Sequence, residues 1–142
     1  MKNLVVDSSV SVKWFVAEDD SPKALQILKD YRSETLSFDA PDLIYAEFGN
    51  IIWKKQIFQN LDPKDAEFAI QEFKKISFTL TPITLLFDAA FNLTVQYKRT
   101  FYDSLYLALS VRENCQFVTA DEKFYNFVRS SFPKIILLSD WQ

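Results

Sequence analysis

Short apolar runs alternate along the chain with longer segments in which apolar residues recur every three or four positions. The first run, Leu4–Val6, is rich in β-branched side chains and predicts a buried strand. Similar runs predict strands near 36–38, 78–80, 117–119 and 135–138. The helical spacing predicts helices over 9–17, from 20 or 21 onward, and over 42–58, 62–76, 85–97, 102–113 and 121–128. Strands that alternate with amphipathic helices indicate an α/β fold with a largely parallel sheet.

Two of these helices begin with a polar residue followed by proline. Asp20 or Ser21 stands before Pro22, and Asp62 stands before Pro63. A short polar side chain can accept a hydrogen bond from a free amide of the first helical turn, where proline needs no partner. We therefore expect Asp20 or Ser21, and also Asp62, to act as N-caps.

Composition narrows the chemistry that the chain can perform. Its 142 residues suit one domain over 1–142. The chain has no His and a single Cys, Cys115, which excludes a Ser-His-Asp triad, a His-ligated metal, a disulfide framework and a cysteine zinc site. Sixteen Lys and Arg stand against 19 Asp and Glu, for a net charge of −3. Carboxylates are therefore the main candidates to carry a reaction.

The hydropathy pattern also bears on location. No stretch approaches the roughly 18 apolar residues of a membrane span. The first residues lack the long apolar region and cleavage site of a secretory signal peptide. We expect a soluble cytoplasmic protein that has no contact with a membrane.

Two acidic residues follow predicted strands at points where a helix begins. Asp7 ends the first strand, and Asp121 ends the strand near 117–119. In open α/β sheets, sites form outside the carboxyl ends of the strands, where helix N-termini also attract anions. The two carboxylates are thus expected to converge. The alternative for each residue alone is a simple N-cap, a position that Asp suits well.

Two further acids border predicted core surfaces. Glu47 lies beside the apolar stripe of the helix 42–58, and Asn50 shares that border. Asp103 is the one acid at the start of the segment 102–109, which is otherwise apolar nearly all round and therefore predicts a central helix. A carboxylate near the core is costly unless it has a partner. The alternatives are a Glu that reaches solvent at the edge of the stripe and an Asp that stabilises a helix start.

Four acids that met in one pocket would repel one another unless a cation neutralised them. Oxygen ligands without His or Cys favour Mg²⁺ or Mn²⁺ over zinc. The residues therefore predict a divalent metal site, which the same four acids can build around one or two ions.

Four sequence blocks carry a known pattern. They are Val5-Val6-Asp7-Ser8-Ser9-Val10 followed by Lys13-Trp14-Phe15, then Pro41-Asp42-Leu43 leading to Glu47 and Asn50, then Tyr102-Asp103-Ser104-Leu105-Tyr106-Leu107-Ala108-Leu109, and Phe117-Val118-Thr119-Ala120-Asp121 followed by Phe124. In order and spacing, from residue 3 to about residue 138, the chain resembles PIN domains and especially the VapC-type toxins.

This resemblance implies a three-layer α/β/α fold with a central, mainly parallel sheet. It implies an acidic pocket of Asp7, Glu47, Asp103 and Asp121 that binds Mg²⁺ or Mn²⁺ and catalyses endoribonuclease cleavage of RNA. Ser9 and Thr119 match positions whose hydroxyls lie near the metal in the family, and Asn50 is typical of it. A small antitoxin commonly restrains such toxins, and homodimers are common.

The resemblance also suggests roles for particular residues. We expect Asp7 and Asp103 to hold the principal metal, Asp121 to share it or to position a second ion, and Glu47 to act from the edge of the pocket. Because the net charge is acidic, contacts to RNA must be local. The candidates to flank the pocket are Lys13, Lys54, Lys55, Lys98, Arg99 and Arg112, of which the pair Lys98 and Arg99 comes first and Lys13 second. Trp53 and Phe58 are candidates for an interface with an antitoxin or a second copy.

Two other functions remain open at this point. One is a non-catalytic interaction module that keeps the PIN fold, although the four acids argue against it. The other is a Mg²⁺-dependent phosphatase, which also places Asp at the ends of parallel strands. That class usually has a second acid near the first strand, where this chain has Ser8 and Ser9.

Overall fold

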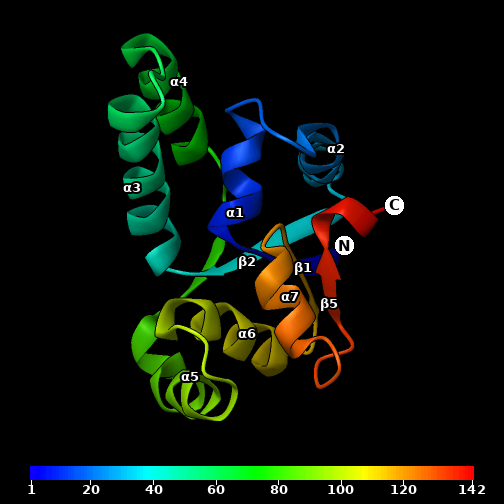
Figure 1. Ribbon diagram of the computed structural model, residues 1–142. Helices are drawn as coiled ribbons and strands as arrows, with labels where there is room; N and C mark the ends of the chain where they lie inside the picture. Colours follow the sequence, from blue (N-terminus) through cyan, green and yellow to red (C-terminus); the bar gives the residue numbers. More distant parts are fainter.

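The computed structural model describes residues 1–142 and is built on one five-stranded parallel sheet (Figure 1). The strands are β1 (Lys2–Val6), β2 (Leu36–Pro41), β3 (Thr79–Thr81), β4 (Gln116–Thr119) and β5 (Ile135–Leu137). Their order across the sheet is β3-β2-β1-β4-β5, and every neighbouring pair is parallel. The predicted strands are therefore all present, and the most central of them is the first in the sequence.

Seven α-helices connect the strands. They are α1 (Ser8–Ser11), α2 (Ser21–Arg32), α3 (Leu43–Phe58), α4 (Pro63–Lys74), α5 (Ile83–Tyr97), α6 (Phe101–Glu113) and α7 (Glu122–Val128), with 3₁₀ turns at Val12–Trp14 and Leu138–Asp140. None of the helices combines the length and the apolar character that crossing a membrane requires.

The helix expected over 9–17 is shorter than its pattern suggests. After α1 the chain tightens into the 3₁₀ turn, and the following segment leaves the helix. There the Glu18 carboxylate forms ion pairs with Lys13 and with Lys55 of α3, which lies far along the chain. A tertiary contact of this kind can override the local helical pattern.

The two predicted proline-linked caps differ in outcome. The Asp62 carboxylate accepts a hydrogen bond from the Lys64 amide at 2.8 Å, as expected for an N-cap. Asp20 makes no such bond, and the Ser21 hydroxyl instead accepts from the Glu18 amide at 2.9 Å. Asp20 thus occupies the expected N-cap position, but the expected side-chain hydrogen bond is missing, and Ser21 serves the loop before the helix.

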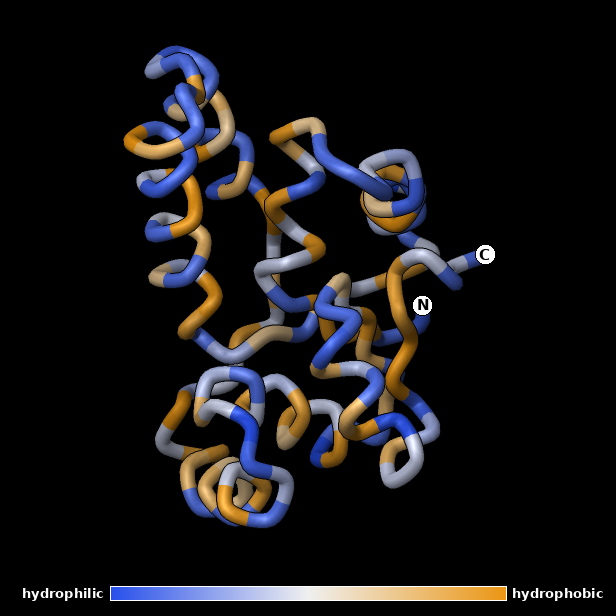
Figure 2. The backbone as a smooth tube through the Cα atoms, viewed as in Figure 1, coloured by the Kyte–Doolittle hydropathy of each residue, from blue (hydrophilic) through white to orange (hydrophobic).

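Alternating side chains of the strands divide the core into two parts, one on each face of the sheet. Leu4 and Val6 of β1 pack with residues of α1 and α2, whereas Val5 packs with residues of α6 and α7. The tube in Figure 2 is correspondingly hydrophobic along the central strands and hydrophilic at many of the outer turns. Helices thus cover both faces of the sheet, and the fold is the predicted three-layer α/β/α arrangement.

Helices α3 and α4 lie side by side and extend away from α5 and α6 (Figure 1). Phe48 of α3 stacks on Phe73 of α4 with 3.8 Å between ring centroids. In the other part of the core, Trp14 stacks on Phe38 of β2 at 4.9 Å. The first contact holds α3 against α4, and the second holds the turn after α1 against the sheet.

The strand order places a switch in direction between β1 and β4. The chain leaves β1 toward β2 on one side of the sheet, and β4 and β5 fill the other side. Ligand sites of open parallel sheets form at such a point, beyond the carboxyl ends of the strands. Asp7 directly follows β1, and Asp121 comes shortly after β4, so both lie at this point.

Candidate active site

Asp7 is a buried carboxylate whose two oxygens both accept hydrogen bonds. Its Oδ1 accepts from the Ser9 hydroxyl at 2.5 Å and from the Val10 amide at 3.3 Å. Its Oδ2 accepts from the Thr119 hydroxyl at 2.6 Å, and only 8% of the residue is exposed. Asp7 is therefore the N-cap of α1, but it is also tied to β4, which a cap does not require.

Strand register explains this contact. Val6 of β1 pairs with Val118 of β4, so the residues that follow, Asp7 and Thr119, meet at the end of the sheet. The Ser9 hydroxyl accepts from the Ala120 amide at 2.9 Å, and the Thr119 hydroxyl accepts from the Asp121 amide at 3.1 Å. The two hydroxyls thus link the end of β1 to the start of α7.

Asp121 and Asp103 each occupy a helix start. The Asp121 carboxylate is exposed and accepts from the Phe124 amide at 3.0 Å, as the N-cap of α7. Asp103 lies in the first turn of α6, where its amide donates to the Thr100 hydroxyl at 3.1 Å. The seven residues that follow it, 104–110, are all buried, which confirms α6 as a central helix.

Glu47 reaches the same region from the first half of α3. Its Oε1 accepts from the Tyr106 hydroxyl at 2.5 Å and from the Ser8 hydroxyl at 3.4 Å. Tyr106 and Ser8 are not among the site residues that the sequence predicts. A signal for Tyr106 exists, because it stands three residues after Asp103 and therefore on the same face of α6, with a polar tip in an apolar run.

The electrostatic environment couples all four acids. Burial, with a smaller contribution from the charge of Asp103, raises the pKa of Asp7 from 3.8 to about 7, against the hydrogen bonds from Ser9 and Thr119. Burial also raises the pKa of Glu47, to which Asp103 again adds. Burial raises the pKa of Asp103 as well, and the charge of Asp121 acts in the same direction. Asp103 is therefore the charge to which each of the other three carboxylates is coupled.

In donor chemistry, this set fits a hard divalent cation. It offers carboxylate oxygens supported by hydroxyl groups, the ligands that Mg²⁺ and Mn²⁺ prefer. As the side chains stand, no three acidic or cysteine residues form a group able to hold a metal ion. The acids are thus coupled by charge without being gathered at ligand distance.

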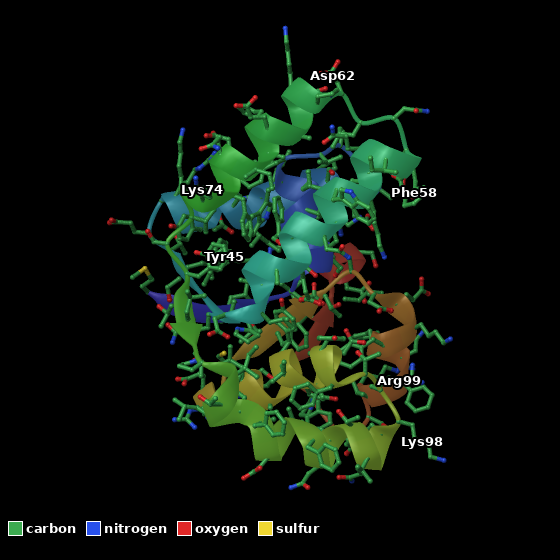
Figure 3. All side chains as sticks on the ribbon, turned by 90° about the vertical axis from the view of Figure 1, so that its left-hand side faces the viewer. Tyr45, Phe58, Asp62, Lys74, Lys98 and Arg99 are labelled. Atoms are coloured by element: carbon green, nitrogen blue, oxygen red, sulfur yellow. The ribbon has the colours of Figure 1, made fainter.

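The basic residues expected near RNA have different surroundings. The Arg99 guanidinium lies 3.9 Å from the centroid of the Phe127 ring, and its charge opposes the rise in the pKa of Asp103, which links it to the acids. Lys98 ends α5 on the surface next to Arg99 (Figure 3). Lys13 instead pairs with Glu18 at 3.4 Å, and its side chain is largely covered.

The remaining predicted residues lie on the exposed side of α3. Asn50 is exposed one turn beyond Glu47, and it makes no side-chain hydrogen bond within the chain that would tie it to the acids. Trp53 and Phe58 are exposed and contact each other edge to face at 6.0 Å, with Phe58 at the end of the helix (Figure 3). Asn50 therefore remains a predicted supporting residue beside Glu47, and Trp53 and Phe58 remain candidates for an interface.

Comparison with protein families matches residues 4–129 to the model of the PIN domain. The chain belongs to the PIN domain family. Comparison with the curated proteins found no significant match. The resemblance inferred from the four sequence blocks is thereby confirmed, and the resemblance covers the strands and helices that carry all four acids of this PIN domain.

Solved structures share the fold at low sequence identity. The crystal structure of PAE2754 from Pyrobaculum aerophilum matches with a TM-score of 0.64 and 19% identity, over 97% of this chain and 92% of that one. VapC20 of Mycobacterium tuberculosis, a sarcin-ricin loop cleaving toxin, matches with a TM-score of 0.63 and 14% identity, over 87% and 93%. VapBC2 from Rickettsia felis, bound to a promoter DNA fragment, matches with a TM-score of 0.61 and 15% identity, over 95% and 96%.

Replacing the buried acid tests its environment. A raised pKa means that the folded PIN domain binds the Asp7 proton more tightly than the unfolded chain does. The bound proton therefore stabilises the fold at low pH, and this contribution to the unfolding free energy is lost as the pH rises from about 4 to about 7. Without divalent cations, Asp7→Asn should gain up to about 4 kcal/mol in unfolding free energy relative to wild type between pH 4 and pH 8. Urea unfolding at both pH values measures this difference.

The exposed Asp19, in the loop before α2, provides the matched control, because Asp19→Asn makes the same change outside the site. Its unfolding free energy relative to wild type should change far less with pH than that of Asp7→Asn. A constant difference for Asp7→Asn would contradict the raised pKa.

Proposed function

We propose that this chain is a metal-dependent endoribonuclease, and that residues 1–142 act as one PIN-like domain that is the toxin of a VapBC-type toxin–antitoxin pair. The observation that carries the proposal is the coupling of four carboxylates at the switch point of a PIN fold. Clusters of acids with perturbed pKa values are typical of functional sites. The structural neighbours, which include a toxin that cleaves the sarcin-ricin loop and toxin–antitoxin complexes, support the same function.

Asp7, Asp103 and Asp121 would hold one or two Mg²⁺ or Mn²⁺ ions, with Glu47 at the edge of the pocket. When bound, such a cation activates water for attack and neutralises charge on the scissile phosphate and leaving oxygen. Because like charges repel, the cation would also be what draws the coupled carboxylates together.

The chain's own residues prepare this pocket. Ser9 and Thr119 fix both oxygens of Asp7, which leaves its carboxylate one orientation toward the pocket. Arg99 supplies positive charge beside Asp103, where an RNA phosphate would approach. The chain contains no His, so no imidazole pair acts as acid and base.

Removing one acid tests the reaction. Asp103→Asn should lower Mn²⁺-dependent cleavage of structured RNA by more than about 100-fold, because losing a direct ligand should exceed the usual cost of losing an outer-shell partner. Chelation should abolish cleavage by the wild type. Water attack should leave a 5′-phosphate and a 3′-hydroxyl, which end-labelling of the products measures.

Asp19→Asn serves here too as the control that should cleave normally. Recovery of a 2′,3′-cyclic phosphate would contradict the mechanism. RNA left intact by wild type and variant alike would instead favour a non-catalytic interaction module, and release of phosphate from a small phosphomonoester would favour a phosphatase.

Removing the positive charge of Arg99 tests its contact with RNA. Arg99→Ala should raise KM about 10-fold with little change in kcat, since a charged hydrogen bond is worth about 1.5–3 kcal/mol. It should also lower the salt dependence of binding by about one unit of slope. Arg32→Ala is the matched control, because Arg32 is exposed at the end of α2, on the other face of the sheet from α6. Equal binding by both variants would show that Arg99 does not contact RNA.

An antitoxin segment would bind beside α3. A hollow of about 330 Å³ lies between α3 and α4, lined in part by Ile52, Trp53, Ala66 and Ile70. The exposed Phe58 extends the apolar surface from Trp53. Exposed apolar surfaces of this kind mark protein interfaces, and an amphipathic helix suits such a groove.

A second copy of the chain would cover α5. Leu85, Phe87, Phe91 and Val95 are each between 51% and 63% exposed, and Asp88 is the one charged residue of this helix. Figure 2 shows the hydrophobic colouring over much of α5 at the edge of the molecule. In a two-fold dimer the same patch meets itself, which suits a surface almost free of charge.

Introducing a charge into this patch tests the dimer. Phe91→Glu should convert a dimer into a monomer in light scattering, because two carboxylates would then face each other across the interface. Phe68→Glu, on the exposed face of α4, is the matched control and should remain dimeric. A monomeric wild type would contradict the proposed homodimer.

A further inference from the structure

Tyr106 is the one large polar side chain within the buried part of α6. The residue is only 2% exposed, and its ring stacks near Phe117 of β4 with 6.1 Å between centroids. The ring thus belongs to the core. Its hydroxyl, however, leaves the core and donates to Oε1 of Glu47 at 2.5 Å, across 59 positions of sequence.

The two carboxylate oxygens of Glu47 differ in their hydrogen bonds. Oε1 accepts from both the Tyr106 and the Ser8 hydroxyls. No hydrogen bond from the chain reaches Oε2. Oε2 is also not a buried atom without a partner, since the buried unpartnered polar atoms are those of Trp14, Asp39 and Trp141. One oxygen is therefore fixed by the protein, and the other is left available.

We infer that Tyr106 is a positioning residue of the proposed nuclease, which anchors Glu47 through Oε1 and so leaves Oε2 as the oxygen offered to the divalent cation. This inference rests on the proposed function. Glu has a long, flexible side chain, and without an anchor it would sample several rotamers. Partners that fix a ligand from outside its contact with the metal commonly set the affinity of the site.

Packing alone does not account for this tyrosine. A phenylalanine would fill the same core volume, and the hydroxyl adds only the reach to Glu47. Its ring is held between α6 and β4, so the donor has little freedom of its own. A rigid donor on one helix thereby fixes a flexible carboxylate on another.

The test measures Mn²⁺ affinity by titration calorimetry, without RNA, in the full chain. The variants are Tyr106→Phe, Glu47→Ala and the double variant. Tyr31→Phe is the matched control, because the Tyr31 hydroxyl also makes a hydrogen bond to a residue distant in sequence, accepting from the Ser77 amide at 2.8 Å, on the α2 side of the sheet. Thermal unfolding of each variant establishes that it is folded.

Tyr106→Phe should weaken Mn²⁺ binding about 10-fold, and Tyr31→Phe should leave it unchanged. In the Glu47→Ala background, Tyr106→Phe should have no further effect, because a residue that acts through Glu47 loses its role when Glu47 is gone. In RNA cleavage, Tyr106→Phe should lower kcat at unchanged KM.

Three results would overturn the inference. Wild-type affinity in Tyr106→Phe, or an equal loss in the Glu47→Ala background, would show that Tyr106 does not act through Glu47, while the proposed metal-dependent function would stand. A wild type that binds no Mn²⁺ would refute the metal-dependent function itself, and the inference would fall with it.

Discussion

The buried carboxylate of Asp7 is the constraint around which the rest of this molecule is arranged. A charge with 8% exposure at the end of the central strand needs partners, and the chain provides hydroxyls from Ser9 and Thr119. Those hydroxyls in turn accept hydrogen bonds from the backbone amides of Ala120 and Asp121. Satisfying one buried acid therefore places a second acid beside it and joins two strand ends into one pocket.

The central helix α6 extends this arrangement to the other half of the chain. Its start presents Asp103 to the pocket, and one turn later Tyr106 holds Glu47 of α3. The same side chains thus serve the core and the site, because the ring of Tyr106 packs while its hydroxyl reaches outward. The raised pKa values of Asp7, Glu47 and Asp103 follow from this burial. The raised pKa values indicate a pocket that favours the binding of positive charge. With cations in that pocket, the net charge of −3 is compatible with an RNA substrate.

Sequence patterns predicted the elements that carry the four acids, since each acid stands at a strand end, at a helix start or beside an apolar stripe. The alternative for Asp7 and Asp121, a simple N-cap, is present at both residues, but Asp7 is in addition bonded to Thr119 of β4. The patterns failed where a distant residue decided the outcome. Glu18 pairs with Lys13 and Lys55 at the point where the first helix ends early. The pair also covers Lys13, which was a candidate for contact with RNA.

The sequence by itself determined the parallel α/β fold, the family and the oxygen-only chemistry, because alternating periodicity, strand-end acids and the absence of His are all local or compositional properties. Only the tertiary structure decided which atoms meet. The register of β1 on β4 brings Thr119 to Asp7, and the position of α3 and α6 on one core brings Tyr106 to one oxygen of Glu47. Such contacts join residues far apart in the chain, and no local pattern records the distance between them.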